Sequence, residues 1–327
     1  MALTDDTRII LIHGLASKPA KETLHELWCR ALIESVGVDS TKLARAMKAN
    51  KDLFESAYWA NEIPDHIEDS AYYVKSMRSC VDDVIKLRRT KKNDLHIGAG
   101  GWVKSKLKSF GLSIVDTLGR AVTIKDNVID EHMNEVHLYQ SDQYTADKVR
   151  APLEDALRRA WDEGKRVMII SHSMGTFISY DVLWRFTHRS EDRYRQYRSK
   201  TVEMLITMGS PLGDETLRDF MLVERWRDST GAKRKTDRQR YYPGNIEQWH
   251  NYSAYGDVVC HDSDLEDDFF KAMRKDVRDY KPGALRDYEK LYNPYVNAEG
   301  TNNPHKSYGY LIQPKLSQNM LRFFGLA

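Results

Sequence analysis

The sequence predicts an α/β protein in which a mostly parallel sheet is covered by helices on both faces. Short, continuous apolar runs such as 166–170 (RVMII) recur along the chain, and longer segments with helical spacing, such as 19–36, lie between them. Buried parallel strands have continuous apolar sequences, and their alternation with helices is typical of a parallel sheet. With 41% hydrophobic residues, the chain can bury a full core. We expect a single domain over residues 1–327.

The first half of the chain contains two predicted strands and two predicted helices. Residues 8–14 (RIILIHG) form a short apolar run closed by glycine, which indicates a buried strand. Apolar residues at helical spacing predict a helix at 19–36. A second strand is predicted at 54–63, ended by Pro64, and a long amphipathic helix at 66–92.

Residues 64–134 are predicted to form an insertion. Beyond the long helix, the stretch 96–132 has an apolar stripe that glycines interrupt. Two interpretations stay open for this stretch: a helical hairpin packed into the core, or a mobile cap over a binding cleft with glycines as hinges. We expect a helical cap within 64–134.

The second half of the chain continues the alternation of strands and helices. The predicted elements are, in order, an extended segment at 135–142, a helix at 145–164, a strand at 166–170, a helix directly after Ser173, a strand at 201–213, an exposed loop at 225–240, a strand at 246–257 and a helix at 315–327.

Charge balance and cysteine content exclude several classes of protein. The 50 Lys and Arg nearly balance the 48 Asp and Glu, so the net charge of +2 gives no general attraction for nucleic acid. Cys29, Cys80 and Cys260 include no CxxC pair, which argues against a disulfide framework or a zinc site. The chain has no signal-peptide pattern and no apolar run of the roughly 18 to 20 residues that span a membrane. We expect a cytoplasmic protein.

No cofactor or metal is expected, because the histidines lack paired spacing and no phosphate loop or dinucleotide motif is present. The basic runs at 88–92 and 225–240 are predicted to be solvated surfaces. If either run contacts a partner, an anionic lipid surface or an acidic substrate fits best, so peripheral membrane contact stays open. Both runs lack the interleaved aromatic residues expected of a single-strand nucleic-acid platform, and no nucleic-acid partner is expected.

Ser173 lies where a predicted strand turns directly into a predicted helix, in VMIISHSMGT (167–176). A serine hydroxyl is a weak nucleophile at neutral pH unless a histidine accepts its proton and an acid orients that histidine. A sharp turn from strand to helix exposes the serine only if the residues two before and two after it are small, because their backbones approach closely. Ser171 and Gly175 meet this condition. Ser173 is therefore the candidate nucleophile.

The pentapeptide SHSMG resembles the G-x-S-x-G nucleophile elbow of the α/β-hydrolase family, with Ser171 in place of the first glycine. MGSPLG at 208–213 resembles the strand after the nucleophile in lipase-like members. The resemblance covers residues 8–36, 135–213 and 245–327. It implies an α/β-hydrolase fold, with a mostly parallel central sheet flanked by helices and a helical cap insertion.

The resemblance also implies an acid and a base. The family's chain order is nucleophile, acid, base, which assigns the acid to Asp257, just past a predicted strand, and the base to His305, in a loop before the last helix. Alternatives for the acid are Asp214, after the preceding strand, and the nearby pair Asp262 and Asp264. Alternatives for the base are His250, which is expected to be a packed core histidine, and His261.

An oxyanion hole is implied by IHGLA, which follows the first predicted strand. By resemblance, its donors are the backbone N–H groups of Leu15 and Met174. Each such donor is worth on the order of 3 kcal/mol of barrier. His13 is expected to shape this loop, and His172, beside the nucleophile, is expected to point to the sheet or its edge.

The function implied is that of a serine esterase resembling carboxylesterases and lipases. It would cleave a small-molecule carboxylic ester through an acyl-enzyme, without a cofactor. The apolar insertion leads us to expect a short or medium apolar acyl chain. A thioesterase or acyltransferase on the same triad stays an alternative, as does a catalytically silent binding module, because one fold supports many activities.

Overall fold

The computed structural model describes most of the chain. The described residues are 3–15, 17–63, 67–92, 95, 139, 142–214, 218, 221–222, 225–226, 229, 242–260, 262–270, 273 and 284–326. The predicted hairpin or cap at 96–132, and almost all of the predicted segments at 135–142 and 225–240, lie outside these residues.

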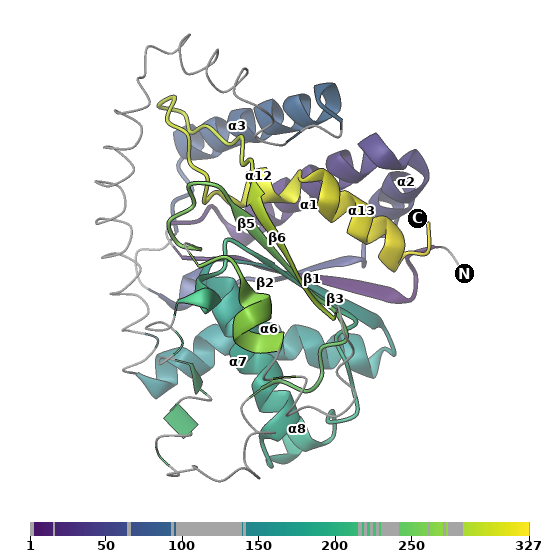
Figure 1. Ribbon diagram of the computed structural model, residues 1–327, viewed down its shortest axis with the longest axis vertical. Coiled ribbons are helices and arrows are strands. Elements are labelled where there is room, and N and C mark those ends of the chain that lie inside the picture. Colours follow the sequence, from purple (N-terminus) through teal and green to yellow (C-terminus); the bar gives the residue numbers. More distant parts are fainter. Residues whose placement is uncertain are drawn as a thin grey trace.

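Six strands of the described residues form one parallel sheet in the order β2-β1-β3-β4-β5-β6 (Figure 1). The strands are β1 (Thr7–Ile12), β2 (Phe54–Ala57), β3 (Arg166–His172), β4 (Met204–Met208), β5 (Trp249–Ala254) and β6 (Leu285–Leu291). In the centre of the sheet, Ile10 pairs with Ile169 and Ile170 pairs with Ile206. The predicted α/β class is confirmed.

Successive residues of the central strands face opposite helical layers, which explains their continuous apolar sequences. Ile10 and Ile12 pack in the core on the side of α6 (Gln143–Asp162) and α7 (Met174–His188). Ile9 and Leu11 pack in the core on the opposite side. That side is covered by α1 (Lys21–Asp39), α2 (Thr41–Ala49), α3 (Ala71–Thr90), α12 (Ser307–Leu311) and α13 (Pro314–Phe323) (Figure 1).

The strand order reverses beside β1, which places β2 on one side of it and β3 on the other. In open α/β sheets, ligands bind outside the carboxyl ends of the strands at such a switch point. A six-stranded sheet in this order is not the canonical α/β-hydrolase sheet. The structure therefore shows an α/β protein with a six-stranded parallel sheet flanked by helices.

The helix predicted at 66–92 is α3, and it belongs to the helical layer of the body. It packs against α1, and its buried residues join the core on that side of the sheet. This part of the predicted insertion at 64–134 therefore does not stand apart from the fold. Most of the remainder lies outside the described residues.

Strand β6 and helix α2 are among the elements that have no counterpart in the sequence predictions. Strand β6 is an edge strand in which only Leu285 and Leu291 are buried, so it has no apolar run to detect. Helix α2 is short, but its signal was present: the Ser40 hydroxyl accepts from the Leu43 N–H, and Leu43 and Met47 are buried one turn apart. The strand predicted at 54–63 is shorter than expected, because a 3₁₀ turn follows at Ala60–Glu62.

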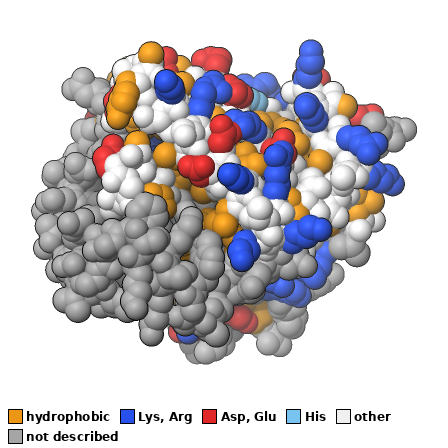
Figure 2. Space-filling view, turned by 90° about the horizontal axis from the view of Figure 1, so that it is seen from above, with side chains coloured by type: hydrophobic (Ala, Val, Ile, Leu, Met, Phe, Trp, Pro, Cys, Tyr) orange, Lys and Arg blue, Asp and Glu red, His pale blue; other side chains and the backbone are white. Residues whose placement is uncertain are grey.

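Figure 2 shows Lys and Arg side chains mixed with acidic and hydrophobic ones on the face that it presents.

The prediction that 88–92 is solvated is wrong for Arg88. Its guanidinium is buried, donates to Asp39 at 2.5 Å and to Ser35 at 3.3 Å, and also binds the Lys92 carbonyl. Of the described helices, none combines the length and the apolar sequence of a membrane-spanning helix.

Candidate active site

Ser173 occupies a sharp turn between the end of β3 and the start of α7. Its backbone has φ 55° and ψ −130°, a conformation that residues other than glycine rarely adopt. Such strain costs of order 1–3 kcal/mol and persists only where surrounding contacts enforce it. Here the Ser173 N–H donates to the Met208 carbonyl at 3.0 Å, and the Ser173 carbonyl accepts from the N–H and hydroxyl of Thr176.

The neighbours of Ser173 are as small as the turn requires. A Cβ on Gly14 would lie 2.4 Å from the Ser173 Cβ, and a Cβ on Gly175 would lie 2.6 Å from the His13 carbonyl oxygen. Ser171, where the elbow motif has glycine, donates its hydroxyl to the Ile206 carbonyl at 2.8 Å. This bond gives the extra hydroxyl a partner on β4, away from the turn.

The structure brings Ser173, His305 and Asp257 together. The Nε2 atom of His305 lies 2.9 Å from the Ser173 Oγ, and its Nδ1 lies 3.0 and 2.9 Å from the two carboxylate oxygens of Asp257. A carboxylate only accepts, so Nδ1 carries the proton and the neutral ring leaves Nε2 as an acceptor for the serine hydroxyl. Although 132 and 48 residues separate these pairs, the strand ends place them at one edge of the sheet.

Asp257 is held in its ionised form. Burial alone would raise the pKa of its carboxyl, but His305 and hydrogen bonds outweigh this effect and lower the pKa to about 2. The bonds come from the Tyr310 hydroxyl at 2.6 Å and the Val259 N–H at 3.0 Å. Asp257 is therefore negatively charged at neutral pH. The sequence did not single out Tyr310, because it is one of 18 tyrosines with no distinguishing pattern.

Gly209, directly after β4, lets the acid and base approach each other. Its φ is +55°, and a Cβ there would lie 2.9 Å from Asp257 Oδ2 and 3.0 Å from His305 Nδ1. Both the left-handed backbone and the close approach require glycine. The MGSPLG segment contains this glycine, so a signal existed in the sequence, although it did not reveal what the glycine contacts.

The alternative acids and bases occupy other positions. Asp257, rather than Asp214, accepts the hydrogen bond that His305 Nδ1 donates, and Asp264 accepts from the Asp267 N–H at 3.2 Å. His250 lies buried in β5 with its ring edge against Tyr288, and burial lowers its pKa to about 4. As expected, it is a packed core histidine. His261 lies outside the described residues. Asp262 sits against Gly213, where an added Cβ would lie 2.3 Å from the Asp262 carbonyl oxygen.

Leu15 and Met174 present backbone N–H groups beside the nucleophile. Leu15 follows Gly14, which touches Ser173, and Met174 begins α7. Within the part of the chain that the structure describes, neither N–H has a hydrogen-bond acceptor. The first N–H groups of a helix lack internal partners and attract negative charge. Of these two donors, the N–H of Met174 lies at a helix N-terminus.

His13 holds the loop that carries Leu15. Its Nδ1 donates to the Gly14 carbonyl at 2.8 Å, its Nε2 accepts from the Trp59 N–H at 3.1 Å, and its ring stacks on the Trp59 ring at 4.7 Å. Because a trans peptide is planar, fixing the Gly14 carbonyl directs the Leu15 N–H to the opposite side. His13 thus fixes the loop that carries Leu15.

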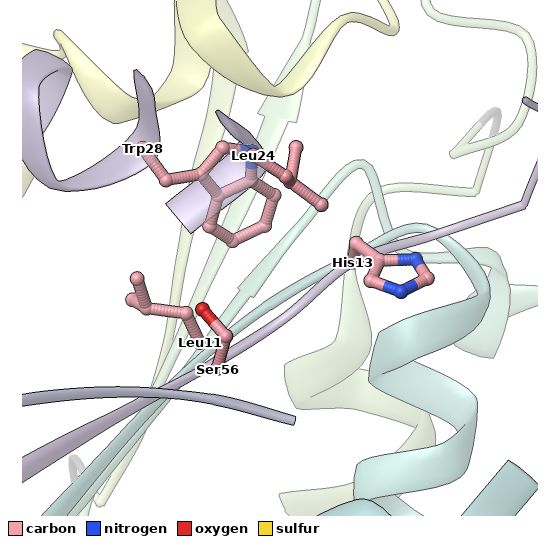
Figure 3. Close-up of a pocket in the computed structure, with 5 residues that line it drawn as sticks. All are labelled: Leu11, His13, Leu24, Trp28 and Ser56. Atoms are coloured by element: carbon pink, nitrogen blue, oxygen red, sulfur yellow. The ribbon is translucent and has the colours of Figure 1, made fainter. Parts of the chain in front are cut away.

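A small cavity lies next to His13, between β1, β2 and α1 (Figure 3). Its lining residues are Leu11, His13, Leu24, Trp28 and Ser56. Most of the lining belongs to the α1 side of the sheet. Ser173 is not among the residues that line this cavity.

Among the described side chains, no group of three or more His, Cys, Asp or Glu could hold a metal ion. Cys29, Cys80 and Cys260 are free. Burial raises the pKa of Cys29 to about 12 and that of Cys260 well above its ordinary value, so both are protonated thiols at neutral pH. Neither cysteine is a competing nucleophile.

Comparisons with known protein families, with curated proteins and with solved structures find no match to this chain. Its function is therefore inferred from the geometry of the site.

Proposed function

We propose that this chain is a serine hydrolase of the α/β-hydrolase type that cleaves carboxylic esters. The observation that carries the proposal is the continuous hydrogen-bonded chain from the Ser173 hydroxyl through His305 to the ionised Asp257. A histidine that only packs in the core does not require a serine at a strained turn beside one ring nitrogen and a buried carboxylate beside the other. That arrangement is what activates a hydroxyl for acyl transfer.

Catalysis proceeds through an acyl-enzyme. Ser173 Oγ attacks the ester carbonyl as its proton passes to His305 Nε2, and Asp257 stabilises the imidazolium that forms. The N–H groups of Leu15 and Met174 bind the oxyanion. His305 then protonates the departing alcohol, and the carbonyl re-forms on the serine ester. Water, deprotonated by His305, attacks this ester and releases the acid and the serine hydroxyl.

Membership of the α/β-hydrolase family is part of the proposal, because the sheet itself is not the canonical one. Three features support it: a nucleophile with positive φ between strand and helix, an acid after β5, and a base before α12. A cytoplasmic location and peripheral contact with anionic lipid are also part of the proposal.

The proposed substrate is a small ester with a short or medium apolar acyl chain, and no cofactor takes part. Esters are favoured over amides because amide cleavage also requires protonation of a poor leaving group. Thioesters and acyl transfer to another alcohol use the same triad. A series of 4-nitrophenyl esters of increasing chain length, run beside acyl thioesters, tells ester from thioester cleavage, and product analysis with an added alcohol reveals acyl transfer. A clear preference for bulky polar acids contradicts the proposed substrate.

Labelling by a fluorophosphonate probe tests the proposal, because only an activated serine reacts. The wild-type protein should be labelled and should hydrolyse esters, and Ser173→Ala should abolish both. Ser179→Ala is the matched control: Ser179 lies on α7, which begins directly after Ser173, is buried and donates to the Gly175 carbonyl at 2.7 Å. A wild-type protein that resists labelling, or a Ser173→Ala variant that labels normally, contradicts the proposal and favours a silent binding module.

A further inference from the structure

Beyond the triad itself, the segment that carries His305 is held by its backbone. The carbonyls of Pro304 and Lys306 accept from the side-chain amide of Asn293 at 2.7 and 2.9 Å. The carbonyl between them, that of His305, accepts from His172 Nε2 at 2.6 Å. Three consecutive carbonyls are therefore held by two buried side chains.

His172 is suited to this role by its position and its protonation state. It is the last residue of β3 and directly precedes the nucleophile, so a bond from its ring joins the strand that ends at the nucleophile to the segment that carries the base. A carbonyl oxygen only accepts, so Nε2 must carry a proton. Burial, and next the nearby His305, lower the pKa of His172 well below its ordinary value, which keeps the ring neutral. The two histidine rings lie 4.7 Å apart.

Asn293 holds the same segment from another direction. It lies just after β6, is 2% exposed, and its Oδ1 accepts from the Tyr295 N–H at 3.1 Å. Its amide leaves no room at Gly309, where an added Cβ would lie within 2 Å of Oδ1 (1.6 Å). His305 needs such support, because its side chain is 19% exposed and lies on a segment outside any helix or strand.

We propose that His172 and Asn293 are positioning residues for the base. We use the name carbonyl clamp for these two side chains together with the backbone carbonyls of Pro304, His305 and Lys306 that they bind. The clamp sets where His305 Nε2 lies relative to the Ser173 hydroxyl. This inference rests on the proposed function. Neither residue touches the reacting atoms, and a displacement of about 1 Å in a catalytic group costs on the order of 100-fold in rate.

His172→Phe keeps a ring and removes the donor, and His172→Gln keeps an N–H donor at similar reach. With a 4-nitrophenyl ester, His172→Phe should lower kcat by about 100-fold with little change in KM, and should slow fluorophosphonate labelling in parallel. His172→Gln should recover most of the loss. A folded Phe variant with wild-type kcat, or a Gln variant as slow as the Phe variant, overturns the assignment of His172.

Asn293→Ala provides a second variant in case His172→Phe does not fold. It should lower kcat with KM nearly unchanged, and a folded variant with wild-type kcat overturns the clamp. The thermal midpoint of each variant reports folding.

Backbone amide hydrogen exchange separates the clamp from the proposed function, because it requires no activity. Exchange in peptides covering 303–309 should speed up in His172→Phe and not in His172→Gln. If the wild-type protein does not label, the proposed function fails, while faster exchange still supports the clamp. Unchanged exchange in a wild-type protein that labels contradicts the clamp alone.

Discussion

Two regions of the molecule bury carboxylates against basic side chains, but only one of them places a titratable base beside a serine hydroxyl. At the strand ends, Asp257 accepts from His305, whose other nitrogen reaches the hydroxyl of Ser173. Between α6 and α7, Glu154 and Asp181 are equally buried. The difference lies in what the partner of each carboxylate can do next.

In the cluster between α6 and α7, the partners are arginines. Arg185 donates to Glu154 at 2.7 Å, and Arg150 lies 3.5 Å from Asp181, which also accepts from the Tyr139 hydroxyl at 2.7 Å. A guanidinium stays protonated and cannot relay a proton, whereas an imidazole can. Buried charge alone therefore does not mark an active site. A titratable partner that also contacts a nucleophile does.

Replacing Asp257 should have the largest effect of these substitutions, and the effect should be on catalysis. Asp257→Asn keeps the shape of the side chain but favours the wrong tautomer of His305, so kcat should fall by about 10⁴-fold. Steady-state hydrolysis of a 4-nitrophenyl ester measures the loss. A decrease of less than tenfold would mean that Asp257 does not orient the base.

In the cluster between α6 and α7, replacing the buried carboxylate of Asp181 should lower stability rather than catalysis. Asp181→Ala leaves Arg150 with one carboxylate fewer and removes the acceptor of the Tyr139 hydroxyl and the Leu222 N–H. Breaking a buried pair of this kind costs about 3 kcal/mol of unfolding free energy. Denaturant unfolding followed by circular dichroism measures it. The folded variant should keep its kcat, and a loss of kcat comparable to that of Asp257→Asn would erase the distinction between the two regions.

A smaller effect should appear in the pH dependence of stability. The pKa of Asp257 is about 2 in the folded protein, below the ordinary value of 3.8, so the folded state favours the ionised form. Its contribution of about 2 kcal/mol is fully present above pH 4 and is lost as the pH falls toward 2. Unfolding free energies of wild type and Asp257→Asn, measured from pH 5 to 2, should converge as the pH falls. If the difference between the two unfolding free energies stays constant from pH 5 to 2, the lowered pKa of Asp257 is contradicted.

The fold class could be predicted because its determinants are local. Ile9 to Ile12 face two helical layers in turn, so the strand must be apolar throughout, and that pattern is legible in the sequence. The edge strand β6 buries only its end residues and leaves no such pattern. Arg88, in a basic run typical of exposed surface, is buried because Asp39 and Ser35 on another part of the chain meet it.

Parts of the candidate site could be predicted for the same reason. The turn at Ser173 needs small neighbours close in sequence, and these can be recognised there. The supporting residues could not be recognised, because Tyr310, Asn293 and His172 matter only through partners far along the chain.

The alternation of strands and helices and the place of the strained turn can be predicted from the amino-acid sequence, because backbone conformation and burial pattern depend on residues a few positions apart. The pairing of His305 with Asp257, rather than Asp214, and the two buried side chains that hold the His305 segment by its backbone depend on how distant segments pack. Hydrogen bonds require donor and acceptor within about 3 Å. That distance between residues 48 to 133 positions apart is set by the packing of the whole sheet.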